Sequence, residues 1–348
     1  MHNSLAFRAA LSAPTSIEAE KTLSIAILAV SITSVLGAGW MILSFILIPS
    51  LRTFRHQLIF GLGISDFMIA LNFMISTIMN FTGHEIWQPA QHAFCSFNGF
   101  IAQMFIIQTD YWVLLIAICT YVILSDNKRA SAWMQGHPIV IWCLPWGLST
   151  LWAVLGLVVV GYGNIGACLF LQRFHALNGL LNWYSGCWFT SDRIRLLVNF
   201  IPRWIIVIAI IVLYAQLCWI LLKAHRAVSS SEEDDTFIML SRSQDTQRRR
   251  QDPSPNNSSN SRSFRKVHPA PSLKKMSRRM MLYPTVYMMI WIIPTAIRIY
   301  QSTAKRPAPL SINILDKVCI AIQGLVDAVI YGLNERTWNA WTERFFWD

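Results

Sequence analysis

The sequence predicts an all-α membrane protein built as a bundle of seven transmembrane helices. Seven separate apolar stretches each have the length that a helix needs to cross a bilayer, about 20 residues. Hydrophobic residues make up 54% of the 348-residue chain and charged residues only 14%, which argues against a soluble globule. The stretches are too long and too continuously apolar for barrel strands, and helices satisfy their own backbone hydrogen bonds in lipid.

The predicted spans follow one another with short connections, except for residues 163–195 between the fourth and fifth and residues 224–279 between the fifth and sixth. They are Thr22–Ile48, Leu58–Phe81, Phe94–Leu124, Pro138–Tyr162, Leu196–Lys223, Met280–Gln301 and Ile312–Leu333. Residues 1–21 form the N-terminal segment, 22–223 the first five spans, 224–279 a long polar loop, 280–334 the last two spans and 335–348 the tail. Residues 1–21 lack an uninterrupted apolar region, so we expect no removable signal peptide.

The distribution of positive charge predicts the orientation. Loops after the odd-numbered spans, counted together with Lys223 at the end of the fifth span, hold 19 Lys and Arg residues, whereas the N-terminus and the other loops hold 7. By the positive-inside rule the N-terminus lies outside and the long loop lies in the cytosol. The net charge of +11 therefore faces anionic lipid and protein partners, and no aromatic-basic motif accompanies it that would indicate nucleic-acid binding.

The polar loop over residues 224–279 is rich in Ser, Asn, Pro and charge, so we expect its centre to be disordered. It ends in a basic cluster, Lys274, Lys275, Arg278 and Arg279, directly before the sixth span. Two interpretations of this cluster stay open: contact with lipid headgroups and docking of a cytosolic protein.

The tail carries Trp338, Trp341 and Phe345 at positions i, i+3 and i+7, which would form one aromatic stripe on a helix. This spacing predicts a short helix lying in the membrane interface. The alternative is an unstructured tail whose aromatic rings partition into the interface.

Ionisable residues inside the spans are candidates for function because burying them in lipid is costly. Asp66 and Asp327 lie at matching depths in the inner half, so we expect one polar cluster. It would also contain Asn72, Gln323 and Tyr331 and join the second and seventh spans through a proton, an ion or water. We favour a structural or switching role for it over transport.

Two further groups lie at the middle and toward the outside. Asp110 is near the midpoint of the third span with Gln103 on the same face, and it could line a ligand pocket or pin neighbouring helices. Arg203, Arg298 and Lys317 lie toward the outer ends of the last three spans. These cations could extend to the headgroups. If they face inward, they predict a cationic vestibule for an anionic or polyhydroxylated ligand.

The cysteines suggest a disulfide, and the lack of catalytic motifs in the sequence argues against an enzyme. Cys95 starts the third span on the outer side, and a bridge to Cys168 or Cys187 would tie the loop after the fourth span over the bundle. No zinc-ligand spacing, catalytic triad order, phosphate-binding loop or paired-carboxylate site is present in the sequence. We therefore expect neither an enzyme nor a cofactor or metal site.

Several segments resemble one family. They are LRTFRHQLIFGLGISDFMIALNF (51–73), CSFNGF and QTDYWVL (95–114), LPWGLSTLWAVLGL (144–157), CWFTSDRIRLLVNFIPRW (187–204), MSRRMMLYPTVYMMIWIIPTAIRIYQ (276–301) and GLVDAVIYGLNE (324–335). The chain is similar through them to fungal G-protein-coupled receptors of the cAMP-receptor-like and carbon-sensing (glucose-receptor-like) group. Rhodopsin-type receptors are only distantly similar, because the third span ends without Asp-Arg-Tyr and the seventh has DAVIYG in place of Asn-Pro-x-x-Tyr.

The resemblance implies a multi-pass plasma-membrane receptor for an extracellular nutrient or other small molecule. Its partner would be the α subunit of a heterotrimeric G protein, which commonly feeds adenylate cyclase and protein kinase A in fungi. Lys128, Arg129 and the basic cluster would then contact the G protein, and Cys187, inside the family-like CWF, would be the partner of Cys95. A non-signalling scaffold and a small-molecule transporter are the alternatives, although the chain shows no internal repeat typical of transporters.

The stretch Cys168–Gly186 has no counterpart in this family pattern, in which Gly-Ala-Trp-Cys-Trp stands at the same point. If Cys168 is encoded by TGT and Ser185-Gly186 by TCA-GGG, a splice can start before the GT of the first codon and end after the CAG that spans the other two. Joining the remaining T and GG restores a single Trp codon. Two interpretations follow: a translated intron or a lineage-specific extracellular loop.

Overall fold

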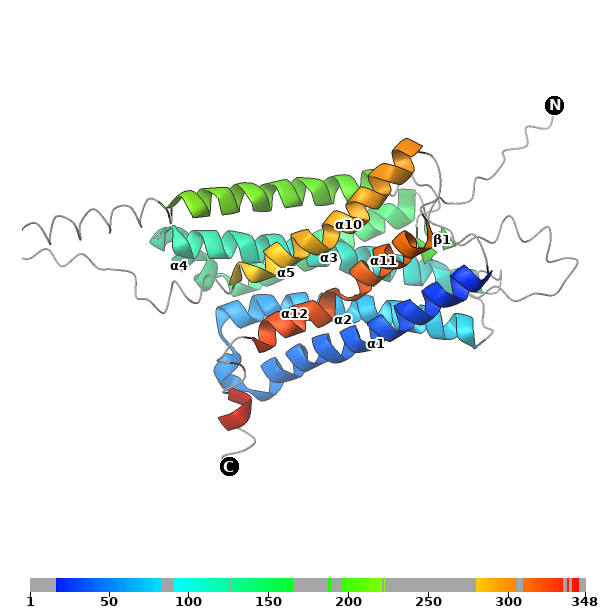
Figure 1. Cartoon of the computed structure of the whole chain (residues 1–348). Helices are drawn as coiled ribbons and strands as arrows, with labels where there is room; N and C mark the ends of the chain where they lie inside the picture. The colour runs from blue at the N-terminus through cyan, green and yellow to red at the C-terminus, as the bar shows by residue number, and fades with distance from the viewer. Residues whose placement is uncertain are drawn as a thin grey trace, which may run out of the picture.

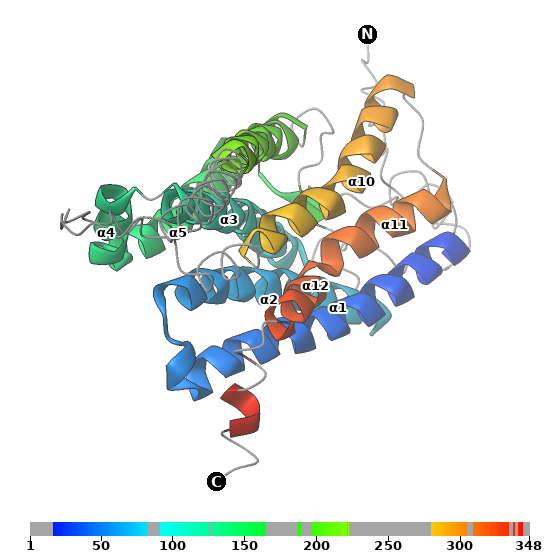
Figure 2. The same cartoon turned by 60° about the vertical axis from the view of Figure 1, so that its left-hand side comes forward.

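The computed structural model describes residues 17–82, 91–125, 127–159, 161–164, 187–188, 196–220, 222, 280–304, 309–333, 337 and 340–343. These residues form a nearly all-helical bundle whose long helices run roughly side by side (Figures 1 and 2). The predicted fold class is confirmed. The predicted N-terminal segment, the centre of the long loop with its basic cluster, and Cys168–Gly186 lie outside or almost wholly outside the described residues.

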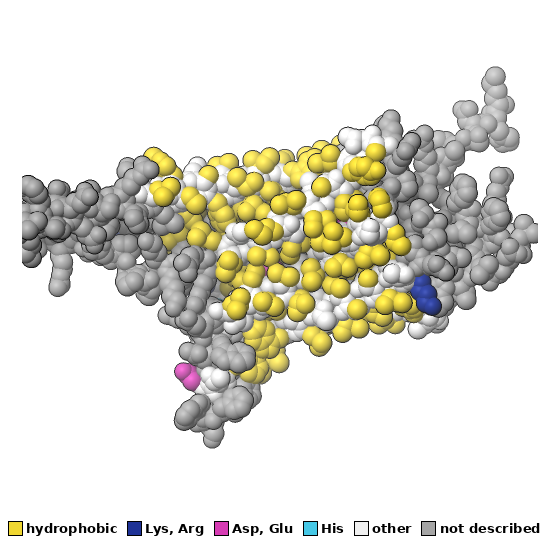
Figure 3. Space-filling model, in the orientation of Figure 1, with side chains coloured by type: hydrophobic (Ala, Val, Ile, Leu, Met, Phe, Trp, Pro, Cys, Tyr) yellow, Lys and Arg dark blue, Asp and Glu magenta, His cyan; other side chains and the backbone are white. Residues whose placement is uncertain are grey.

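Six of the described helices are long and apolar enough to cross a membrane. They are α1 (Ile17–Leu47), α2 (Phe54–Phe81), α3 (His92–Leu124), α5 (Pro138–Val159), the fifth spanning helix (Leu197–Ile220) and α10 (Leu282–Ala304). The fifth spanning helix begins with a π-helical turn over Leu196–Phe200. Apolar side chains cover the face of these helices seen in Figure 3, as a lipid-facing surface requires.

The seventh crossing is made by two consecutive helices, α11 (Leu310–Ala321) and α12 (Gln323–Gly332). The sequence predicts a single span over Ile312–Leu333, and the structure shows that its helix is interrupted at Ile322. No proline causes the interruption. Helical hydrogen bonds continue across it, because the Ile322 amide donates to Val318 at 2.9 Å and the Val326 amide to Ile322 at 3.1 Å. The two pieces therefore act as one path across the bilayer.

Two glycines allow helices to approach closely. A Cβ on Gly61 of α2 would lie 2.3 Å from the indole of Trp112 on α3, so that position accepts no side chain without repacking. A Cβ on Gly324 of α12 would lie 2.7 Å from the hydroxyl of Ser34 on α1. These contacts bring α1, α2, α3 and α12 together, and α3 is the most deeply buried of the spanning helices.

Short elements connect the spans at the two ends of the bundle. On the cytosolic side, η1 (Pro49–Leu51) follows α1, and α4 (Lys128–Gly136) begins where the Asn127 side chain accepts a hydrogen bond from the amide of Ala130. On the outer side, β1 (Gly163–Asn164) pairs antiparallel with β2 (Cys187–Trp188). This small ribbon was not predicted, and β2 lies against α3.

The described part of the tail packs back onto α1. Thr337 is fully buried, residues 340–343 are helical, and the indole N–H of Trp341 donates to the hydroxyl of Ser44 at 2.9 Å. One ring of the predicted aromatic stripe is thus held by the bundle, whereas Trp338 and Phe345 lie outside the described residues.

The ribbon bears on the translated-intron interpretation of Cys168–Gly186. Asn164 pairs with Cys187, so replacing Cys168–Gly186 by a single Trp would leave four residues between the paired strands, a common hairpin length. We expect this shortened protein to reach the membrane and melt at least as high as the full chain, measured by fluorescence-detected size-exclusion chromatography after heating. Loss of folded protein, or mature transcripts that retain the segment as the dominant form, would contradict the intron interpretation.

Candidate functional site

The ionisable residues predicted inside the spans are buried in the bundle. Asp66, Asp110, Arg203, Arg298 and Asp327 are each at most 8% exposed, and Gln103 is fully buried on α3 two turns outward from Asp110. Arg203 is 1% exposed, so the interpretation in which the outer cations extend to the headgroups is wrong for it. The buried cations must therefore be compensated by polar partners inside the protein.

Asp110 and Arg203 compensate each other in the middle of the bundle. The Arg203 Nε donates to both carboxylate oxygens of Asp110, at 3.1 and 3.0 Å, and Nη2 lies 3.0 Å from Oδ2. The hydroxyl of Tyr287 on α10 donates to the same carboxylate at 2.5 Å. One carboxylate on α3 thus holds the fifth spanning helix and α10. We call these three residues the core joint.

Arg203 also connects the core joint to the seventh crossing. Its guanidinium lies over the ring of Trp291 on α10, with 3.4 Å between Cζ and the ring centroid. This is cation–π geometry, which gains strength away from water. The indole N–H of Trp291 donates to the side-chain oxygen of Gln323 on α12 at 3.3 Å.

The predicted inner cluster joins the same path. Asp327 lies near Gln323, one turn before it on α12, and near Asp66 on α2. The hydroxyl of Thr109 donates to Asp66 at 3.4 Å, and Thr109 is the chain neighbour of Asp110. These neighbouring polar side chains form a polar ring through α3, the fifth spanning helix, α10, α12 and α2; within it, Oδ2 of Asp66 and Nε2 of Gln323 make no hydrogen bond to any described residue.

Two residues predicted for the inner cluster lie elsewhere. The amide of Asn72 donates to the backbone of Asn98 at 3.2 Å, and Asn98 donates to Ser76, which ties α2 to α3 farther outward. Tyr331 stands one turn beyond Asp327, where its ring packs against Trp40 and His56. Asn72 leaves α2 in a different direction from Asp66, six residues earlier, whereas Tyr331 lies on the same face of α12 as Asp327 but one turn farther along the helix.

A second charged group lies at the outer end of α10 and α11. Arg298 and Lys317 both contact Oδ2 of Asp316, each at 3.1 Å, and Arg298 donates to the side-chain oxygen of Gln301 at 2.8 Å. The Arg298 guanidinium also lies 5.6 Å from the ring centroid of Phe200 on the fifth spanning helix. We call Arg298, Asp316 and Lys317 the outer charged group; it carries two cations and one carboxylate.

Several buried polar atoms on the fifth spanning helix make no hydrogen bond to any residue that the structure describes. Both side-chain amide atoms of Asn199 are buried without a hydrogen bond, and so is Nη1 of Arg203, one turn along the same face of the fifth spanning helix. Buried polar groups normally find partners, so these atoms mark a place where a polar ligand or water can bind. Among the described residues, no cluster of His, Cys, Asp and Glu could hold a metal ion.

The remaining predicted site residues lie on the two surfaces. Lys128 and Arg129 are exposed in the first turn of α4, on the cytosolic side. Cys95 is buried at the start of α3, the helix against which β2 with Cys187 lies. The pairing of these two cysteines stays a prediction that the position of β2 supports.

Sequence reasoning missed Tyr287, Trp291 and Asp316. Tyr287 and Trp291 stand at i and i+4 on the sixth span, a spacing that put both rings on one face and could have indicated an inward stripe. Asp316 directly precedes Lys317, and a carboxylate beside a cation inside a span is itself a signal of a buried pair. No signal in the sequence pairs Asp110 with Arg203, which are 93 residues apart.

The fold and this polar core define a class of protein. The chain superimposes on the crystal structure of squid rhodopsin with a TM-score of 0.60, covering 96% of this chain and 87% of that one at 17% sequence identity. At this identity the likeness establishes the seven-helix fold alone.

The family follows from the sequence comparisons. A family model described as "G protein-coupled glucose receptor regulating Gpa2" matches residues 19–227, and the model of its C-terminal part matches residues 271–340. Two receptors of the fungus Arthrobotrys oligospora are similar: ascaroside receptor GPR2, 38% identical over 96% of this chain and 93% of that one, and ascaroside receptor GPR3, 30% identical over 91% and 86%. The chain belongs to this glucose-receptor family of G-protein-coupled receptors. It is a multi-pass membrane receptor that acts on a G-protein α subunit, and not an enzyme.

If Asp66 and Asp327 share one network, the loss of stability on removing both carboxylates should differ from the sum of the two single losses. We expect Asp66→Asn and Asp327→Asn to couple by about 0.5–3 kcal/mol in thermal stability of the purified receptor. The matched pair Asp66→Asn with Asn98→Ala should be additive, because Asn98 bonds to Asn72 and Ser76 instead. Additivity in the Asp66–Asp327 cycle would show that the two carboxyls are independent.

Proposed function

We propose that this protein is a plasma-membrane receptor that binds an extracellular anionic or polyhydroxylated small molecule in the outer half of the bundle. Binding changes the core joint, frees α10 to move at its cytosolic end, and so activates a Gα subunit that feeds adenylate cyclase and protein kinase A. The observation that carries the proposal is the core joint, in which one carboxylate ties three spanning helices.

The chemistry of the outer half supports this ligand class. Among the described residues, Arg203, Arg298 and Lys317 bring three cations together with the carboxylates of Asp110 and Asp316. The unpaired atoms of Asn199 and Arg203 add hydrogen-bond donors and an acceptor. Carboxylates, phosphates and sugar hydroxyls are the groups that such donors bind, with Arg favoured for anions.

The descriptions of the relatives are consistent with an extracellular small-molecule ligand, but they name different molecules. The family is described by glucose, and the two similar receptors of Arthrobotrys oligospora are named for ascarosides. A chain 38% identical to one of them shares its architecture, while the side chains of the outer half select the ligand.

The core joint supplies a physical switch. An anionic ligand beside Arg203 competes with Asp110 for the guanidinium, and it shifts the bundle only if it binds the rearranged state more tightly. α10 is suited to move, because Pro294 inside it removes one helical hydrogen bond and permits bending. The cytosolic end of α10 is held by a long contact, 3.3 Å from the Tyr214 hydroxyl to the backbone of Met281.

The ligand is tested by guanine-nucleotide exchange on Gα with the full receptor in lipid nanodiscs. The panel contains glucose, uncharged sugars, sugar acids, short organic acids and nucleotides. We expect the active compounds to be anionic or polyhydroxylated and to need about tenfold higher concentration with Asn199→Ala. Activation by purely apolar compounds alone would contradict the ligand class.

Removing the carboxylate of the core joint should activate the receptor without ligand. Asp110→Asn leaves Arg203 buried and unpaired, which destabilises the resting arrangement by about 3–5 kcal/mol. We expect a several-fold rise in basal exchange per folded receptor. The double variant Asp110→Asn with Arg203→Gln removes both charges and should show a smaller rise. Wild-type basal exchange in Asp110→Asn would show that the ion pair does not hold the resting state.

The G-protein face is proposed to combine Lys128 and Arg129 of α4 with the basic cluster before α10. Reversing Lys274, Lys275, Arg278 and Arg279 to Glu should abolish exchange while the receptor still reaches the cell surface. The matched control reverses Arg248, Arg249 and Arg250 in the same loop, far in sequence from α10, and should exchange normally. Normal exchange by the first variant would exclude the basic cluster from the face.

A further inference from the structure

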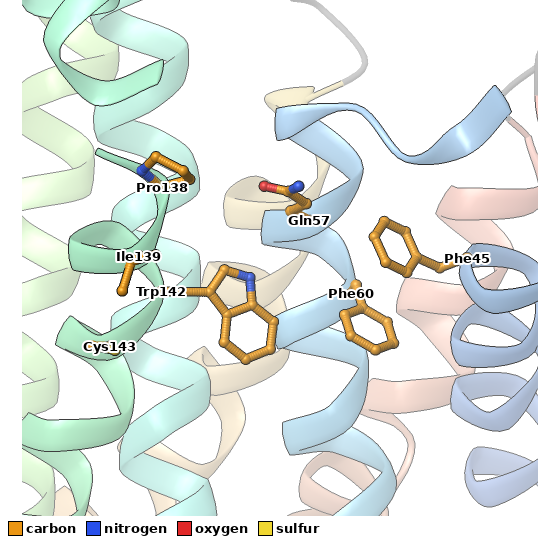
Figure 4. Close-up of a pocket in the computed structure, with 7 residues that line it drawn as sticks. All are labelled: Phe45, Gln57, Phe60, Pro138, Ile139, Trp142 and Cys143. Atoms are coloured by element: carbon orange, nitrogen blue, oxygen red, sulfur yellow. The ribbon is translucent and has the colours of Figure 1, made fainter. Parts of the chain in front are cut away.

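A cavity of about 330 Å³ opens on the lipid-facing surface, at the cytosolic ends of three helices. It is lined by Phe45 of α1, Gln57 and Phe60 of α2, and Pro138, Ile139, Trp142 and Cys143 of α5 (Figure 4). We call it the inner-leaflet slot. Each lining residue lies within about two turns of the cytosolic end of its helix, so the slot opens into the inner half of the bilayer.

Aromatic contacts fix the shape of the slot. Phe45 and Phe60 stack, with 4.4 Å between ring centroids and 18° between planes. The ring of Trp142 lies next to that of Phe60, with 6.0 Å between centroids, and it packs edge-on against Trp112 at 5.3 Å and parallel to Trp146 at 6.1 Å. The walls therefore belong to the packed core of the bundle, and the slot is a preformed depression with apolar walls.

Two polar groups interrupt these apolar walls at one level. The side-chain amide of Gln57 and the indole N–H of Trp142 make no hydrogen bond to any residue that the structure describes. Figure 4 shows the Gln57 amide above the Trp142 ring, toward the cytosolic end of the slot. Donors at this depth match ester carbonyls, which lie where acyl chains meet headgroups.

A cation is bound to the backbone of the α1 wall, on the cytosolic side of the ring of Phe45. Arg52 donates from Nη2 to the carbonyl of Ile46 at 2.6 Å and from Nε to that of Phe45 at 3.5 Å. Its guanidinium is thus fixed beside the backbone of a residue whose ring lines the slot. Arg52 is exposed, and these contacts use two of its five N–H donors, so the others are available to a phosphate.

We propose that the inner-leaflet slot is a binding site for one anionic phospholipid of the cytosolic leaflet. An acyl chain lies over the neighbouring rings of Phe45, Phe60 and Trp142, the ester region accepts hydrogen bonds from Gln57 and Trp142, and the phosphate pairs with Arg52. The order of groups, apolar walls, then donors, then a cation, matches the order of groups along a phospholipid. A sterol would fill the apolar part and leave Arg52 unused.

The test is native mass spectrometry of the full receptor released from detergent micelles that contain phosphatidylserine, phosphatidylcholine or ergosterol. We expect one retained phosphatidylserine, held about fivefold better than phosphatidylcholine, since one cation near an anionic surface contributes about that factor. Arg52→Gln should remove this preference and Arg52→Lys should keep most of it.

Blocking the slot separates a site from ordinary lipid contact. Ile139 is 76% exposed, so Ile139→Trp should fold normally, fill the slot and abolish retention of the phospholipid. The matched control, Leu151→Trp, changes an exposed residue in the outer half of the same helix and should retain it. Equal retention by Ile139→Trp and wild type, no preference for phosphatidylserine, or retention of ergosterol that is indifferent to Arg52 would each overturn the proposal.

Discussion

The arrangement of this receptor depends on one constraint: a charged pair buried in the membrane must be fully compensated. Asp110 and Arg203 are both almost completely buried, and neither charge could stay there alone. Each side chain therefore fixes the other, and Tyr287 adds a third helix to the contact. Because a lone buried charge costs several kcal/mol, α3, the fifth spanning helix and α10 stay in register around this pair.

The same pair is one part of a closed polar ring. Arg203 contacts Trp291, Trp291 donates to Gln323, and Gln323 leads through Asp327 and Asp66 back to Thr109 beside Asp110. A change of partners at Arg203 is therefore connected through neighbouring polar side chains to the inner half of α2 and α12. Direct contact between packed side chains is the physical basis that such coupling needs, provided that the ring has two arrangements.

The sequence predicted the parts of this core better than their partners. Hydrophobic length predicted all seven crossings, and the cost of burying charge singled out Asp66, Asp110, Arg203 and Asp327. Pairings between helices far apart in the chain, such as Asp110 with Arg203, depend on how the helices rotate in the bundle, which periodicity does not specify. The break at Ile322 has no proline or glycine at the break itself, so the sequence does not indicate it. Asn72 was predicted in the inner cluster from its depth, without regard to the direction of its side chain. The inner-leaflet slot also arises only from packing, because its lining comes from three helices.

Double electron–electron resonance tests most directly whether the core joint restrains α10. Cys143 and Cys218, which are free and exposed, are first replaced by Ser. Spin labels are then attached at Ser50→Cys, exposed after α1, and at Leu282→Cys, at the start of α10. They report the distance between the cytosolic ends of these two helices. Breaking the pair with Asp110→Asn should lengthen that distance by about 5 Å, one helical turn. An unchanged distance distribution in a folded Asp110→Asn receptor would contradict the claim.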